Sequence, residues 1–223
     1  MAPETTAATQ AQQGTPEAEQ PAVPRDQLIR RAATELFMEK GYAATSMREL
    51  ARAVGIEAAS LYNHLPSKQE LLATMLLSTM EELVDAVRSA VVAPDDPTEQ
   101  LRAATIAYVM FHQDHMREAA ITDSERRSLT PEHAERLLHL RDQLAAVFRE
   151  VLARGAQTGE FDIQDVHLEA VFILSICARL PVWYRDGGRL PLDVIGRLIA
   201  DFAVAAVACP RNGGPGSTEF GGR

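Results

Sequence analysis

Residues 46–65 of this 223-residue chain have the pattern of a short helix, a tight turn and a second short helix. Ser46 and Glu49 have the spacing of a capping box, in which each side chain accepts a hydrogen bond from a free backbone N–H group at the helix start. Gly55 is the residue type best able to take the positive φ that ends a helix. A three-residue turn, 55–57, then leads into a segment that ends before Pro66. The pattern predicts a helix-turn-helix.

Apolar residues recur at helical spacing along most of the chain, and no strand pattern competes with them. Ser67 and Glu70 form a second capping-box pattern, which opens a long helix that stops before Pro94. The helices expected after it cover 98–116, 118–127, 130–158, 165–184 and 191–208. The sequence therefore predicts an all-α fold with a three-helix domain at 25–70 and a larger helical domain at 71–208. The segments 1–24 and 209–223 are predicted to be disordered or flexible tails, because they are rich in Pro or Gly and poor in large apolar residues.

The net charge of −9 conceals an asymmetry along the chain. Residues 25–68 include seven bases and five acids, whereas residues 69–223 include 15 bases and 23 acids. A small, net positive module thus precedes a strongly acidic one. This division indicates a module that binds a polyanion, followed by a module with a different role.

No segment predicts a membrane span or a secretory signal. The longest nearly uninterrupted apolar stretch, 170–178, is shorter than the roughly 20 residues that cross a bilayer. Residues 1–24 lack the basic start and apolar centre of a secretory signal. We therefore expect a cytoplasmic protein with no membrane partner.

Common catalytic motifs are missing: the Gly-x-Ser-x-Gly elbow, the phosphate loop, the dinucleotide fingerprint and His-Glu-x-x-His. We predict no catalytic residue, no cofactor and no metal site. His112 and His115, three apart on one helical face, nevertheless leave open a metal-dependent helical enzyme completed by Asp114 or Glu118. A helical adaptor that senses no ligand is a further alternative. A pair of imidazoles on an inward face is more often part of the core or of a polar ligand pocket.

The region around the predicted helix-turn-helix carries several residue types at fixed spacing, namely Gly41-Tyr42, Gly55-Ile56, Leu61-Tyr62, His64 and Pro66-Ser67-Lys68. On these residues the chain resembles the TetR family of bacterial one-component repressors. The resemblance implies a homodimer that binds a palindromic double-stranded operator through residues 45–68. It also implies a small-molecule effector bound by the C-terminal helical domain, which then serves for ligand binding and dimerisation.

The candidate DNA contacts lie on and around the third helix. Small residues at its start, Ala58 and Ser60, allow the backbone to approach a major groove, where Asn63 would contact base edges or phosphate. Hydrogen-bond donors suited to phosphate flank the helix, and Arg48 would contact the DNA backbone or an adjacent base. The predicted DNA-binding residues are Thr45, Arg48, Ala58, Ser60, Tyr62, Asn63, His64 and Lys68.

A candidate effector site lies in the C-terminal domain, where Arg179 and Trp183 are four apart in an apolar helix. The guanidinium either pairs with an acidic side chain across a subunit interface or anchors an anionic head group, with Trp183 stacked beside it. The run Trp183–Gly188 resembles a run found in a TetR subgroup associated with acyl-coenzyme A ligands. The predicted lining comprises Tyr108, Phe111, His112, Met116, Phe148, Phe172, Arg179 and Trp183.

A two-fold dimer through the segments 165–184 and 191–208 is expected, because the last helix carries an apolar stripe wider than one domain's own core needs. The stripe comprises Ile195, Leu198, Ile199, Phe202, Ala203 and Ala206.

Overall fold

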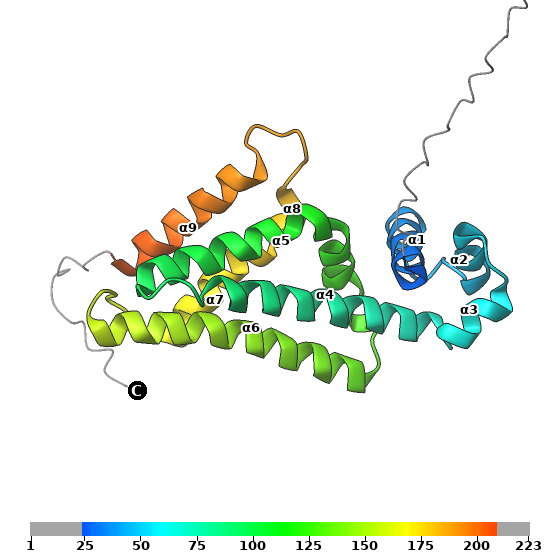
Figure 1. Ribbon diagram of the computed structural model, residues 1–223, viewed down its shortest axis with the longest axis horizontal. Helices are drawn as coiled ribbons and strands as arrows, with labels where there is room; N and C mark the ends of the chain where they lie inside the picture. The colour runs from blue at the N-terminus through cyan, green and yellow to red at the C-terminus, as the bar shows by residue number, and fades with distance from the viewer. Residues whose placement is uncertain (1–23, 209–223) are drawn as a thin grey trace, which may run out of the picture.

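The structure is a computed structural model that describes residues 24–208, except for the side chain of His64. The tails expected at 1–24 and 209–223 therefore fall outside the described residues, apart from Pro24. No strand occurs within 24–208, which confirms the all-α prediction (Figure 1). The helices are α1 (Arg25–Lys40), α2 (Met47–Val54), α3 (Ala58–His64), α4 (Lys68–Ala90), α5 (Pro97–Glu125), the 3-10 turn η1 (Arg126–Ser128), α6 (Pro131–Thr158), α7 (Val166–Ala178), α8 (Leu180–Trp183) and α9 (Leu192–Ala208).

The helix-turn-helix forms as its capping signals predict. The Ser46 side chain accepts a hydrogen bond from the Glu49 backbone N–H, and the Glu49 carboxylate accepts one from the Ser46 N–H at 2.9 Å. Gly55 ends α2 with a φ of 74°, in the left-handed region that favours glycine. Leu61 of α3 is fully buried against α1, α2 and the start of α4, which fixes the orientation of α3. The core of this domain comprises Ile29, Ala33, Phe37, Met47, Leu50, Ala51, Leu61, Leu71, Leu72, Met75, Leu76 and Ile121.

Helix α4 belongs to both hydrophobic cores of the chain. Its first half contributes Leu72 and Leu76 to the N-terminal core, and its second half contributes Leu83 and Val87 to the C-terminal core. Figure 1 shows α4 running from α3 into the helical bundle. A movement of α4 therefore changes the position of α2 and α3 relative to the bundle.

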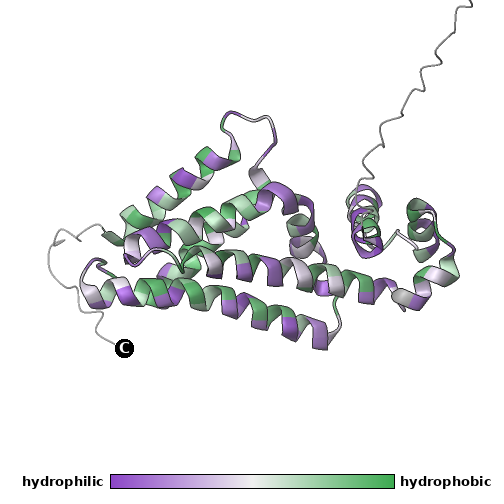
Figure 2. Ribbon diagram, viewed as in Figure 1, coloured by the Kyte–Doolittle hydropathy of each residue, from purple (hydrophilic) through white to green (hydrophobic). Residues whose placement is uncertain are grey.

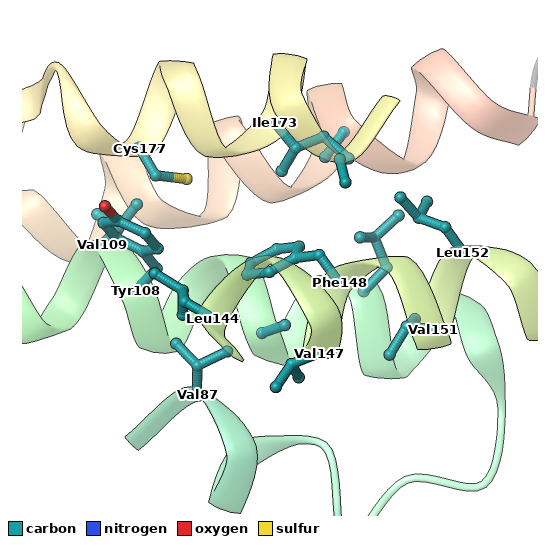
Figure 3. Packing of buried hydrophobic residues seen from close by; sticks show 14 of the residues in the cluster. Val87, Tyr108, Val109, Leu144, Val147, Phe148, Val151, Leu152, Ile173 and Cys177 are labelled. Atoms are coloured by element: carbon teal, nitrogen blue, oxygen red, sulfur yellow. The ribbon is translucent and has the colours of Figure 1, made fainter. Parts of the chain in front are cut away.

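The C-terminal core lies among α4, α5, α6, α7 and α9. Hydrophobic and hydrophilic residues alternate along α4 and α6 (Figure 2), as expected for helices with a buried stripe. Phe148 is fully buried in the core, near Leu144 and Ile173 (Figure 3). Phe148, predicted to line the effector site, therefore packs in this core, and its contact with an effector stays a prediction.

Two helix breaks fall between residues 98 and 184. The segments expected at 98–116 and 118–127 are two helical stretches that meet at a kink at His115 (φ −123°, ψ 18°), beside the expected break, and together they form α5. The helix expected at 165–184 is divided at Arg179 into α7 and α8. Pro181 explains the second break, because it has no backbone N–H to continue the hydrogen-bond ladder of α7.

Candidate operator interface and effector cavity

The exposed side of α2 and α3 presents most of the residues predicted to contact DNA. Arg48 and Asn63 are exposed, and Tyr62 is 48% exposed although it lies beside the fully buried Leu61. Ala58 and Ser60 are partly buried at the start of α3, and their side chains are short, so the helix backbone lies close to the molecular surface there. The side chain of His64 is outside those that the structure describes. The surface thus combines short side chains with polar ones, as close approach to a groove requires.

Arg52 is a further basic residue on this side that the sequence reasoning did not single out. It is exposed one turn after Arg48 on α2, and neither arginine forms an ion pair with another described residue. By contrast, Lys40 is paired with Glu49 at 2.9 Å. The (i, i+4) spacing of two arginines was the available signal for this basic face.

Lys68 and Thr45 differ from their predicted role as phosphate contacts. The Lys68 ammonium donates hydrogen bonds to the backbone carbonyls of Tyr42, Ala43 and Thr45, at 2.7, 3.1 and 2.8 Å. It also lies 4.4 Å from the centre of the Tyr42 ring. Thr45 is buried, and its hydroxyl donates to the Gly41 carbonyl at 3.0 Å. Both side chains therefore hold the loop between α1 and α2 in place.

A cavity of about 90 Å³, open to solvent on one side, lies among α4, α5, α6 and α7, and it is lined by three of the predicted residues, Tyr108, Phe111 and His112. Its inner wall is mainly apolar, with Met80 and Leu83 from α4. Its full lining is Thr79, Met80, Leu83, Tyr108, Phe111, His112, Ala119, Thr122, Asp123, Arg126, Leu137, Arg141 and Ala178.

The charged residues of this cavity, Asp123, Arg126 and Arg141, are all exposed. Neither Arg126 nor Arg141 forms an ion pair with another described residue, whereas Asp123 is paired with Arg179 at 3.3 Å. Charge is thus confined to the solvent side of a mainly apolar cavity. Such an arrangement suits a ligand with an apolar body and an anionic end.

The remaining predicted lining residues lie elsewhere. Arg179 is exposed and meets the cavity only through its pair with Asp123. Phe172 is exposed on α7, and Trp183 lines an apolar groove of about 590 Å³ between α7–α8 and α9. Met116 lines a polar cleft of about 830 Å³ between α1, α5 and the segment 184–193. The break before Pro181 separates Trp183 from the face of α7 that turns inward.

A large apolar surface extends over α7, α8 and α9. Its exposed members are Leu168, Val171, Phe172, Val182, Trp183, Leu198 and Phe202. Of the predicted α9 stripe, Ile195 and Ala203 instead lie in the chain's own core. The 18-residue segment Val166–Trp183 is long and apolar enough to cross a membrane by length and composition alone, which the sequence reasoning did not anticipate. Its inner side contributes Ala170, Ile173 and Cys177 to the core.

Polar contacts connect the cavity wall to α1 of the N-terminal domain. Thr79, which lines the cavity, accepts a hydrogen bond from Arg30 at 2.7 Å. Arg30 also pairs with Glu82 at 2.8 Å, and Glu82 forms a hydrogen bond with His115 at 3.1 Å. Since α5 is kinked at His115, a change in that kink would be transmitted to α1 through the side chains of Glu82 and Arg30.

His115 has partners other than His112. Its ring is stacked on Phe111 with centroids 4.0 Å apart, and its Nδ1 lies 3.1 Å from the Phe111 carbonyl oxygen. Within residues 24–208, no group of three His, Cys, Asp or Glu side chains lies close enough to hold a metal ion.

Both halves of the chain match known protein families. Residues 29–75 match the family described as bacterial regulatory proteins, tetR family, and residues 94–207 match the tetracyclin repressor-like C-terminal domain. The chain belongs to the TetR family. TetR proteins are transcriptional regulators that bind operator DNA, so this chain is a DNA-binding regulator and not a metal-dependent enzyme or an adaptor.

Individual TetR relatives match over nearly their whole length. The HTH-type transcriptional repressor KstR2 of Rhodococcus jostii is 30% identical over 191 residues, which cover 84% of this chain and 93% of that protein. KstR2 of Mycobacterium tuberculosis has a solved structure with a TM-score of 0.76 and 25% identity, covering 84% of this chain and 96% of that one. AibR, solved in complex with isovaleryl coenzyme A and operator DNA, has a TM-score of 0.71 and 26% identity, covering 83% of this chain and 98% of that one.

Proposed function

We propose that this TetR regulator is a cytoplasmic, homodimeric repressor that binds a palindromic operator and leaves it when a lipophilic anion binds. An acyl-coenzyme A thioester is the effector class that we favour. The observation that carries the proposal is the double role of α4, which packs in the core beneath α3 and also lines the cavity with Thr79, Met80 and Leu83. A ligand that displaces α4 also displaces α3.

The operator contacts in this proposal come from α2 and α3. Arg48 and Arg52 neutralise phosphates, while Asn63 contacts a base edge and Tyr62 a phosphate. The phosphate contact predicted for His64 is retained. Lys68 and Thr45 support this surface from behind by holding the preceding loop.

The dimer in this proposal forms through α7, α8 and α9. The exposed apolar surface there, with Phe202 facing the groove beside Trp183, is of the kind that a second copy covers. The same pairing accounts for the apolar character of Val166–Trp183, because one side packs inside the chain and the other would pack against its partner. Two copies of α3 would then be held at a fixed spacing, as a palindrome requires.

The effector class is supported by the distribution of charge around the cavity. An apolar acyl group fits the inner wall, and the anionic part fits between Arg126 and Arg141 at the mouth. Similarity to AibR, whose structure contains isovaleryl coenzyme A, supports the same class.

Replacing Arg126 and Arg141 together by methionine is expected to weaken effector-induced release from the operator at least tenfold, because each charge-assisted contact contributes about 1.5–3 kcal/mol. Operator binding without ligand should not change. The measurement is operator fluorescence anisotropy with a panel of acyl-coenzyme A thioesters and free acids. Arg154→Met, an exposed arginine on α6 outside this lining, is the control. If Arg179→Met abolishes the response and the double variant does not, the head group binds at Arg179 instead.

A further inference from the structure

His112 is a buried polar side chain without a hydrogen-bond partner. It is 3% exposed, and neither Nδ1 nor Nε2 has a partner among the described residues. It lies in the walls of both the effector cavity and the polar cleft beside α1. Its nearest aromatic neighbour is Tyr108, with ring centroids 5.6 Å apart.

An unpaired imidazole in the interior destabilises the folded chain, because its nitrogens lose their water partners and gain none. Buried polar groups in proteins are nearly always paired, so an exception in a cavity wall points to a partner that arrives from outside. The rest of the wall offers apolar contact through Met80, Leu83 and Phe111. In the buried part of this cavity wall, the His112 ring is thus a polar group with no hydrogen-bond partner.

The protonation state of His112 narrows what that partner can be. Burial lowers the pKa of His112 to about 4. The Cys177 backbone opposes this shift, but it lies outside hydrogen-bonding geometry to either ring nitrogen. The ring is therefore neutral near pH 7 and offers one N–H donor and one nitrogen acceptor. An anionic group at this depth would lack a cation, since Arg126 and Arg141 are at the exposed mouth. A neutral carbonyl or hydroxyl oxygen can form a hydrogen bond with the neutral ring and does not require a buried cation.

We propose that His112 binds a neutral oxygen in the buried part of the effector, so that the effector belongs to the oxo or hydroxy acids or their thioesters. The proposal rests on the effector cavity of the proposed function and specifies its ligand. An unsubstituted acyl chain leaves the imidazole unpaired and binds less tightly.

The first test needs no ligand. His112→Phe replaces the ring by an apolar one, and an unpaired imidazole predicts that Tm rises by about 2–4 °C, the shift that about 1 kcal/mol produces in a chain of this size. His112→Gln, which keeps a donor and an acceptor, should not give this rise. A lower Tm for His112→Phe would mean that the ring has a structural partner and would overturn the proposal.

The second test uses matched probes that differ by one oxygen: hexanoate, its 4-oxo and 5-oxo derivatives and 5-hydroxyhexanoate, each as free acid and coenzyme A thioester. Calorimetry should show an oxygenated member binding the parent protein at least about tenfold more tightly than its unsubstituted counterpart. His112→Phe should abolish this preference, and His112→Gln should restore part of it.

Equal affinities within each pair, or a preference that persists in His112→Phe, would overturn the assignment, as would a failure of every oxygenated probe to bind. The proposed function is judged separately, by release of the operator with unsubstituted acyl-coenzyme A thioesters of different lengths. Release without any oxygen preference would retain the repressor and remove His112 from ligand recognition.

Discussion

Phe202→Asp is expected to give monomers and to reduce operator affinity at least 100-fold. Phe202 is 61% exposed on α9 and lines the groove that Trp183 borders. A carboxylate there would be buried without a cation in the proposed interface, which is strongly destabilising. A monomer binds one half-site and loses the gain in effective concentration that links two half-sites. Sedimentation velocity gives the oligomeric state, and operator anisotropy gives the affinity.

Leu138→Asp is the matched control for this experiment. Leu138 is also exposed, at 63%, but it lies on α6 outside the apolar surface of α7, α8 and α9. The control should remain dimeric and bind the operator like the parent. Phe202→Asp dimers at micromolar concentration would place the interface on another surface.

Lys68→Met is expected to lower the free energy of unfolding by about 2–4 kcal/mol, because it removes three charge-assisted hydrogen bonds to backbone carbonyls. Methionine keeps most of the aliphatic stem, so the lost interactions are those of the ammonium. The effect would appear as a lower midpoint in urea unfolding with an unchanged slope. The folded fraction should bind the operator with only a small loss of affinity.

Arg48→Met is the comparison for Lys68→Met, since Arg48 is exposed and has no ion-pair partner among the described residues. Its stability should stay within about 0.5 kcal/mol of the parent, while operator affinity falls and becomes less sensitive to salt. If Lys68→Met instead leaves stability unchanged and weakens binding to all DNA sequences, Lys68 is a phosphate contact, as its position in the sequence suggested.

The N-terminal domain was largely predictable because its signals are local. The capping box of Ser46 and Glu49 and the left-handed Gly55 determine where α2 begins and ends within ten residues. The role of Lys68 was not predictable in this way. Its acceptors lie 23 to 26 residues earlier, so a basic residue suited to phosphate could not be distinguished from one that supports a loop.

The cavity that we propose for the effector could be predicted only in part, because it depends on the packing of distant elements. Tyr108, Phe111 and His112 lie within five residues of one helix, and their spacing placed them on one side correctly. Arg126 and Arg141 come from η1 and α6, and no periodicity relates two elements separated by a turn. Helical spacing predicts that Arg179 and Trp183 share one face, but the break before Pro181 ends that spacing between the two residues. The sequence indicates that Pro181 disturbs the helix, but not how far the two side chains then diverge.

Recognition of a palindrome by α2 and α3 of a dimer can be measured by selecting genomic DNA fragments with the purified protein. We predict a footprint over two inverted half-sites. The affinity should fall with salt at a log–log slope of about −4 if two arginines per subunit neutralise phosphates. Asn63→Ala should relax selection at one base pair per half-site, which corresponds to about 1–3 kcal/mol of lost discrimination. Selection of no common sequence, or an affinity independent of salt, would mean that α2 and α3 do not bind an operator in this way.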